Sequence, residues 1–168
     1  MGHINRKFNA FVEGHSTHTE IEELTTPVVR DHIETIKAGG LLAEFEVPLG
    51  LQKLEAGMKL NSRQHNVMKF AGLTPGKFIR PTFRSVSIDE ANGDQQDEVI
   101  VIQGRLNVDS STLQAQSVSG IDYKWTSISY FKHTVAGKPT LYEIDLMNMI
   151  CIVDGVDQWA SLRNGLGF

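Results

Sequence analysis

Apolar and polar residues alternate without interruption along residues 53–61, which read KLEAGMKLN. Successive side chains of a β-strand point to opposite faces, so this pattern predicts a strand with one buried and one exposed face. A strand of this kind must cover its apolar face with a second layer, which constrains the chain to a layered β-architecture. The apolar face would consist of Leu54, Ala56, Met58 and Leu60.

Most of the remaining sequence also has the composition of strands. Turn signals at Glu13-Gly14, Asn92-Gly93 and Ala136 to Pro139 separate runs rich in β-branched and aromatic residues. The first turn predicts a hairpin whose return strand lies in residues 17–24. Gly104 is expected to form a β-bulge. Further strands are predicted at 77–89, 97–109, 121–135 and 140–153.

Two short helices are expected beside the strands. The first begins near Ser62 and ends at Gly72, and the second covers residues 156–165 with Asp157 as its N-cap. The apolar face of the second helix is predicted to pack on the outside of the subunit's own barrel. This face consists of Trp159, Leu162 and Leu166. The fold class is therefore mainly β, an antiparallel β-barrel or sandwich with two short helices, in a single domain over residues 1–168.

Residues 28–50 are expected to be largely loop, because Gly39, Gly40 and Pro48 interrupt them, although residues 28–36 could be extended. A loop of this length in a compact domain is usually functional or is ordered by a partner.

The charge of the chain argues against a protein that grips nucleic acid. The formal net charge is −4, and neutralising phosphates requires clustered Lys and Arg. Cys151 is the only cysteine and lies in the apolar run MICIV, so we expect a buried, inert thiol and folding in a cytoplasm. No signal peptide or membrane insertion is expected, because no apolar run approaches the ~20 residues of a membrane span.

A search for chemical motifs gives only weak candidates. His15 and His18 could offer two metal ligands, but a solvated hairpin tip is the better interpretation. Glu143 and Asp145 share one face of a predicted strand and could be imagined as a catalytic pair, although an exposed or interface-facing edge is more common. The aromatic residues Tyr123, Trp125 and Tyr130 could stack bases, but core packing is favoured. We expect no catalytic residues, no cofactor and no metal.

The C-terminal sequence YEIDLMNMICIVDGVDQWASLRNGLGF resembles a known family. It is similar to the C-terminus of the major tail tube proteins of P2-type contractile-tailed phages and to the tubes of R-type bacteriocins. Segments 9–14, 23–27, 37–51, 66–73 and 128–145 also resemble the family in order, while the tip at 14–22 departs from it. The C-terminal match consists of Tyr142, Glu143, Ile144, Asp145, Asn148, Asp154, Gly155, Val156, Asp157, Arg163, Asn164, Leu166 and Gly167.

The resemblance implies a ring-forming structural subunit in a virion, assembled in the host cytoplasm. Hexameric rings would stack into a hollow tube through pairing of strands between subunits. The implied partners are further copies of the chain, the contractile sheath, the tape-measure protein, and the baseplate and terminator proteins. DNA would pass through only as cargo during ejection.

Three groups of residues are candidates for contacts in such a tube. Contacts between rings or subunits are assigned to Lys37, Gly39, Gly40, Glu44 and Glu46 in the long loop. The polar face of the 53–61 strand, with Lys53, Glu55, Lys59 and Asn61, is the lumen candidate. The polar face of the last helix, with Gln158, Ser161 and Arg163, is expected to face the sheath.

Alternative functions remain open at the level of sequence. The chain could form the tube of an R-type bacteriocin or a related injection particle that carries no DNA. A small ligand-binding β-barrel or a hydrolase would instead be a monomer or small oligomer with a polar pocket. A tail terminator or sheath subunit would share the particle, but sheath proteins are usually far longer.

Overall fold

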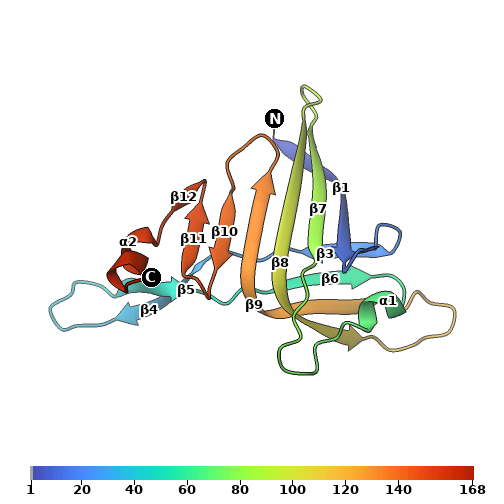
Figure 1. The fold of residues 1–168 in the computed structure, drawn as a ribbon, viewed down its shortest axis with the longest axis horizontal. Helices are drawn as coiled ribbons and strands as arrows, with labels where there is room; N and C mark the ends of the chain where they lie inside the picture. The colour runs from blue at the N-terminus through green and yellow to red at the C-terminus, as the bar shows by residue number, and fades with distance from the viewer. Residues whose placement is uncertain (1) are drawn as a thin grey trace.

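The computed structural model describes residues 2–168, and it consists mainly of antiparallel strands. Ten strands form one sheet with the path β12-β11-β10-β9-β8-β7-β1-β2, to which β6 and β3 are joined through β9 (Figure 1). Strands β4 and β5 form a separate pair. The strands are β1 (His3–Val12), β2 (His15–Ser16), β3 (Ile21–Thr25), β4 (Asp31–Ile36), β5 (Phe45–Leu51), β6 (Ala56–Leu60), β7 (Thr82–Asp89), β8 (Gln95–Ser110), β9 (Ile121–Val135), β10 (Tyr142–Asp145), β11 (Ile150–Val153) and β12 (Val156–Asp157), and the helices are α1 (His65–Met68) and α2 (Ala160–Gly165).

Strands β8 and β9 are long and serve two layers. Residues 98–103 and 130–135 pair within an upper sheet that also holds β7, β1 and β10, whereas residues 105–110 and 121–126 form a lower sheet with β6 and β3 (Figure 1). The register shifts between Gln103 and Arg105, which confirms the bulge expected at Gly104. A Cβ on Gly104 would lie 2.9 Å from the carbonyl oxygen of Thr126, so only glycine fits this bend.

The core lies between the two layers. Leu54, Ala56, Met58 and Leu60 are all buried, which confirms the buried face expected from the alternation along residues 53–61. Phe83 of the upper sheet meets Trp125 of the lower sheet edge-to-face, with ring centroids 5.5 Å apart. Tyr123 and Trp125 are fully buried, so their expected role in core packing is confirmed, whereas Tyr130 is only partly buried and lies outside the core.

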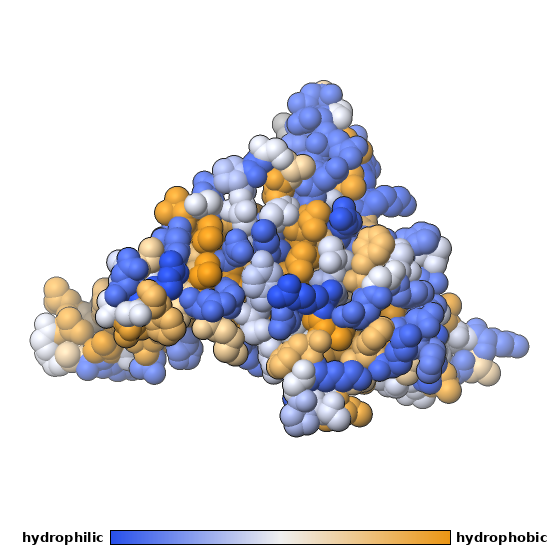
Figure 2. All heavy atoms as spheres, in the orientation of Figure 1, coloured by the Kyte–Doolittle hydropathy of each residue, from blue (hydrophilic) through white to orange (hydrophobic). Residues whose placement is uncertain are grey.

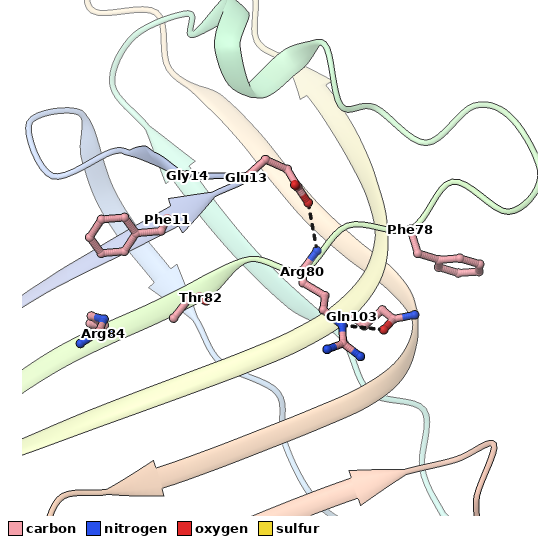
Figure 3. Close-up of a pocket in the computed structure, with 8 residues that line it drawn as sticks. All are labelled: Phe11, Glu13, Gly14, Phe78, Arg80, Thr82, Arg84 and Gln103. Atoms are coloured by element: carbon pink, nitrogen blue, oxygen red, sulfur yellow. Dashed lines mark hydrogen bonds between the residues drawn. The ribbon is translucent and has the colours of Figure 1, made fainter.

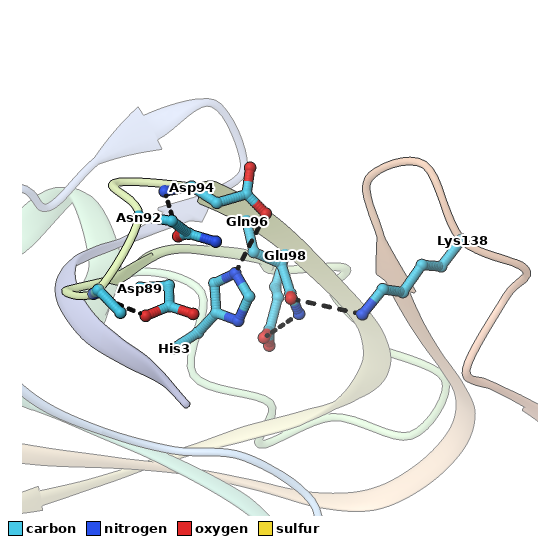
Figure 4. Close-up of polar contacts among 8 residues, drawn as sticks. His3, Asp89, Asn92, Asp94, Gln96, Glu98 and Lys138 are labelled. Atoms are coloured by element: carbon cyan, nitrogen blue, oxygen red, sulfur yellow. Dashed lines mark hydrogen bonds and ion pairs between the residues drawn. The ribbon is translucent and has the colours of Figure 1, made fainter. Parts of the chain in front are cut away.

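The turns expected at Gly14, Gly93 and Gly137 are present, and all three glycines adopt positive φ angles. The turn between β7 and β8 is held by side chains. The backbone N–H of Ala91 donates to Asp89 Oδ1, and that of Asp94 donates to Asn92 Oδ1, both over 2.9 Å (Figure 4). These bonds satisfy backbone donors at the tip of the β7–β8 hairpin.

Residues 31–51 form a β-hairpin, so the expectation that residues 28–50 are largely loop is wrong, whereas β4 confirms the extended backbone considered for residues 28–36. Strands β4 and β5 pair from Asp31↔Leu51 to Ile36↔Phe45 and project away from the sheets (Figure 1). Every residue from 30 to 46 is exposed. The hairpin lacks a buried face, and it therefore lacks the alternating pattern from which a strand is recognised. We call residues 31–51 the arm.

The expected final strand at 140–153 is two strands. The return strand expected at residues 17–24 is wrong, because β1 pairs with β2 at His15–Ser16, whereas Ile21–Thr25 forms β3 and pairs with β6. Asp145 explains the first difference, because its carboxylate accepts hydrogen bonds from the backbone N–H groups of Met147 and Asn148 and from Asn148 Nδ2. The chain then turns through Met149 at φ 52°. A side chain, rather than glycine or proline, therefore makes this reversal.

Both helices are shorter than expected. Helix α1 buries Val67 and is capped at Lys69, not at Gly72. Helix α2 begins at Ala160, because Val156–Asp157 forms β12 and Trp159 occupies the N-cap. Leu162 and Leu166 are 59% and 65% exposed, so the prediction that this face packs on the subunit's own barrel is wrong.

Candidate assembly surfaces

The arm presents apolar and acidic side chains at its tip. Leu42 is fully exposed and Phe45 is 63% exposed. Lys37 and Glu44 lie across the hairpin and pair over 2.6 Å, which leaves Glu46 on β5 without an ion pair among the described residues. Gly39 and Gly40 lie between the two strands, so the structure places all five contact candidates on the arm.

The outer face of the lower sheet carries paired charges. Lys59 pairs with Glu22 over 3.5 Å, and Lys124 pairs with Asp109 over 3.0 Å. Lys53 pairs with Glu55 over 2.8 Å, and the hydrogen bond from Lys53 lowers the pKa of the Glu55 carboxyl. Glu22, Lys124 and Asp109 could not be recognised as part of this surface from the sequence, because their proximity depends on the pairing of β6 with β3 and of β9 with β6 and β8.

Lys53, Glu55 and Asn61, three of the four lumen candidates, are exposed, and Lys59 is partly buried. The strand register identifies their neighbours on β9 and β8, because it places Lys59 opposite Asp122 and Asp122 opposite Asp109. Lys59 therefore lies in a charged row that spans the lower sheet. Lys53 and Glu55 precede β6, and the charge of Lys124 also acts to lower the pKa of Glu55, whereas Asn61 follows β6.

The C-terminal surface differs from the one expected. Arg163 donates to Asp157 over 2.6 Å and to the carbonyl oxygen of Met149 over 3.1 Å, so its guanidinium is bound within the subunit. The hydrogen bond from Arg163 lowers the pKa of the Asp157 carboxyl. Gln158 and Ser161 are exposed. Figure 2 shows apolar side chains gathered at this end of the molecule and over the neighbouring arm.

Two open grooves lie on either side of the subunit. The first, of about 800 Å³, lies between the base of the arm and α2 and is lined mainly by apolar residues, including Leu49, Trp159 and Leu162. Cys151 also lines it and is only partly buried, so the expectation of a fully buried thiol is wrong. Partial burial still raises the pKa of this thiol, which disfavours the reactive thiolate. We call this the C-terminal groove.

The second groove, of about 860 Å³, runs across β1, β7 and β8 and holds two arginines (Figure 3). Arg80 donates from Nε to Gln103 Oε1 over 2.8 Å, and its guanidinium lies 5.2 Å from the centre of the Tyr130 ring. Arg84 is exposed and forms no ion pair with any residue from 2 to 168. We call this the arginine groove.

The residues named above as weak candidates for a metal site or a catalytic pair make ordinary structural contacts. Ser16 Oγ lies 3.1 Å from His18 Nδ1, and no group of three or more potential metal-ligating residues occurs within residues 2–168. Glu143 accepts a hydrogen bond from Tyr130, whose pKa is raised by burial and by the charge of Glu143. Asp145 holds the turn after β10 instead of pairing with Glu143.

No helix in the described part of the chain is long and apolar enough to cross a membrane.

A two-layered β-subunit with a projecting, exposed arm offers surfaces to other chains, as the subunits of self-assembling structural proteins do. The chain belongs to the phage tail tube protein FII family, whose sequence profile matches residues 3–167. A sequence comparison with curated proteins finds no match. The chain is therefore a structural tail tube subunit and a component of a virion or related particle, and the family expected from the C-terminal sequence is confirmed.

Solved structures confirm the fold class. A chain in the cryo-EM structure of the sheath-tube complex of an extracellular contractile injection system, PVC, in the extended state, has a TM-score of 0.53 at 8% identity, covering 77% of this chain and 89% of that chain. A chain in the sheath/tube terminator structure of the same system has a TM-score of 0.50 at 8% identity, covering 76% of this chain and 93% of that chain. At this identity the likeness concerns the fold alone.

Proposed function

We propose that the chain, as a single tail-tube domain without enzymatic activity, forms hexameric rings that stack into the inner tube of a contractile tail. A sheath surrounds this tube, a tape-measure protein fills it during assembly in the host cytoplasm, and baseplate and terminator proteins close its two ends. DNA passes through the finished tube during ejection. The family match over residues 3–167 carries this proposal.

Unpaired strand edges support ring formation. Within the described residues, β3 pairs only with β6. The 105–110 part of β8 forms a ladder only with β9, and its other edge receives one backbone hydrogen bond, from the N–H of Gly72 to the carbonyl oxygen of Leu106. Free edges invite pairing with another chain. If the β3 edge of one subunit pairs with the β8 edge of the next, the contact is heterologous and closes into a ring, which removes both edges.

The outer face of the lower sheet is our candidate for the lumen, because it carries the charged face of β6 and because the sheet has edges at β3 and β8 that could join neighbouring subunits into a continuous wall. On this face the acidic side chains outnumber the basic ones, so the surface would repel phosphate and let DNA slide. The acidic side chains are Glu22, Glu23, Glu55, Asp109 and Asp122, and the basic ones are Lys53, Lys59, Arg105 and Lys124.

The arm supports stacking of rings. A two-stranded hairpin with no buried face is marginally stable by itself in water. A neighbouring subunit would cover the exposed apolar side chains and order the arm, which is the role proposed for the region around Lys37, Gly39, Gly40, Glu44 and Glu46. Gln158 and Ser161 on the C-terminal surface remain candidates for contact with the sheath, together with the exposed side of α2.

Negative-stain electron microscopy of the purified protein at rising concentration tests the proposal. Rings or stacked hollow tubes are expected. Monodisperse monomers that persist after addition of a tape-measure or baseplate protein would refute the tube function and would favour a ligand-binding barrel.

A second candidate, a tube in a contractile particle without DNA, is favoured by the fold shared with an extracellular contractile injection system. R-type bacteriocins are particles of this kind. Genes for a capsid and a terminase beside the gene for this chain would decide for a phage tail, and their absence would decide for such a particle.

A further inference from the structure

The tip of the arm has exposed apolar side chains and a carboxylate without a basic partner, and neither is covered by the rest of the subunit. Leu41, Leu42 and Phe45 are 48%, 109% and 63% exposed, although apolar side chains of this size are normally covered. Glu44 and Glu46 flank Phe45 on β5, and only Glu44 has a basic partner, the exposed Lys37. A surface that covers the tip should therefore offer both apolar contact and positive charge.

The arginine groove offers both. Phe11 and Phe78 line it at opposite ends, with Arg80 and Gln103 between them (Figure 3). Arg80 uses Nε for Gln103, so its two terminal nitrogen atoms form no hydrogen bond with the described residues, and Arg84 is exposed. The groove also contains Glu13, whose carboxylate accepts from the backbone N–H of Arg80 over 3.4 Å. The two guanidinium groups leave an excess of positive charge.

The arm and the groove cannot meet within one chain. The arm projects at the left of Figure 1, whereas β1 and β7, which carry the groove, lie at the right. Two unlike surfaces on opposite sides of a subunit form a heterologous contact when they pair between copies. Such a contact repeats from copy to copy, as the stacking of rings requires.

We propose that the arm tip of one subunit docks in the arginine groove of a second copy in the adjacent ring. Glu44 and Glu46 then face Arg80 and Arg84, while Leu42 and Phe45 cover Phe11 and Phe78. Carboxylate and guanidinium groups form strong paired hydrogen bonds, and aromatic residues and arginine are enriched in the centres of interfaces. This inference rests on the proposed tube function and names the partner surface of the arm.

The C-terminal groove is the competing site for the arm. Its apolar lining could accept Leu42, but none of its lining residues is basic, and Asp31 contributes a carboxylate. Glu44 and Glu46 would gain no cation there and would lie near a like charge. The charges of the arm therefore favour the arginine groove.

Cross-linking between separately prepared chains tests the contact. Leu42→Cys and Phe78→Cys are made in a Cys151→Ser background, mixed, assembled and treated with a short bismaleimide. Cross-linked dimers are expected from the mixture of Leu42→Cys with Phe78→Cys. A second mixture, of Leu42→Cys with Leu162→Cys, tests whether the arm instead occupies the C-terminal groove. Gly40→Cys provides a second arm position, since a side chain there meets nothing within 4 Å. Cross-links to Leu162→Cys, or none to Phe78→Cys from either arm position, would overturn the docking.

Charge reversal gives an independent test. Arg84→Glu is expected to raise the protein concentration at which tubes form by about tenfold or more, because like charges then face each other. Glu46→Arg should act in the same way, and the double variant should recover most of the loss. Lys138→Glu, an equal charge reversal on an exposed turn, is the matched control. Circular dichroism checks that each variant is folded.

The outcomes separate the two proposals. Failure of the parent protein to form any tube would refute the proposed function. Tubes that form normally from Arg84→Glu, or loss that the double variant does not recover, would overturn the docking and leave the tube function standing.

Discussion

Arg163 on α2 donates from Nη2 to Asp157 Oδ2 on β12 over 2.6 Å, and this pair ties the last helix to the edge of the sheet. A second hydrogen bond, from Arg163 Nη1 to the carbonyl oxygen of Met149, reaches the turn before β11. Asp157 also accepts from the backbone N–H of Trp159 over 3.0 Å. The C-terminal end is therefore held by polar contacts instead of by an apolar helix face.

This pair predicts a pH dependence. The pKa of Asp157 is lowered mainly by the hydrogen bond from Arg163, so the pair stabilises the fold above the unfolded pKa of the carboxyl. The stabilisation is lost as pH falls through the lower folded pKa, in the range below about pH 4. In Arg163→Met the NMR titration midpoint of Asp157 should rise toward its ordinary value, whereas Lys138→Met should leave it unchanged. An unaltered midpoint in Arg163→Met would contradict this account.

Gly104 should tolerate no side chain. Gly104→Ala places a Cβ 2.9 Å from the carbonyl oxygen of Thr126 and 3.1 Å from Ile128 Cγ1, at the bend shared by both layers. We expect a loss of about 1–3 kcal/mol in the free energy of unfolding, measured by urea denaturation of the free subunit. Gly39→Ala, which meets nothing within 4 Å, is the control and should change this energy by about 0.5 kcal/mol or less. Equal effects of the two changes would refute the role of Gly104.

Phe83 should be among the most important core residues. Phe83→Ala removes the edge-to-face contact with Trp125 and opens a cavity between the layers, so we expect a loss of about 3–5 kcal/mol in the free energy of unfolding. The fluorescence of Trp125 should shift to longer wavelength as water gains access. Leu113→Ala, at a residue 67% exposed, should cost about 0.5 kcal/mol or less. A small loss at Phe83 would mean that the two layers are not held together at this contact.

The sequence predicts the layered part of the fold, because apolar and polar residues alternate along a strand that has one buried and one exposed face. The strand with Leu54 and Met58 could be recognised for this reason, and so could the bulge at Gly104. The arm could not, because every residue of β4 and most residues of β5 are exposed, so no alternation of buried and exposed side chains marks them. The reversal after β10 was missed because the Asp145 carboxylate makes the turn, without the glycine or proline that usually marks one.

For the candidate contact residues, the sequence indicates which segments carry them but not which side chains they contact after folding. Their positions in sequence identify the arm and the charged strand, but the binding of Arg163 depends on Asp157 and Met149, which approach it only after β10, β11 and β12 have paired. The arginine groove was missed altogether, since Arg80 and Gln103 come together through the pairing of distant segments. Their roles in assembly stay predictions.

The exposed face of α2 should matter for assembly and not for folding. Leu162→Ser and Leu166→Ser change residues that are more than half exposed, so the free energy of unfolding should change by about 0.5 kcal/mol or less at each site. Co-assembly with the sheath, followed by sedimentation, should fall in the double variant and stay normal in Leu113→Ser. Normal sheath assembly in the double variant would remove this face from the sheath contact.

The lumen assignment predicts an effect on DNA passage. Glu23→Lys and Asp122→Lys reverse charge on the outer face of the lower sheet without breaking an ion pair of the described residues. If this face lines the lumen, the added cations would bind phosphate, so DNA release from particles should slow at low salt and recover as salt rises, because binding that releases counterions weakens steeply with salt concentration. Asp94→Lys, on the exposed β7–β8 turn, is the matched control and should release DNA normally. Equal release rates for all three variants at every salt concentration would place this face away from the DNA path and would make the outer face of the upper sheet the next candidate.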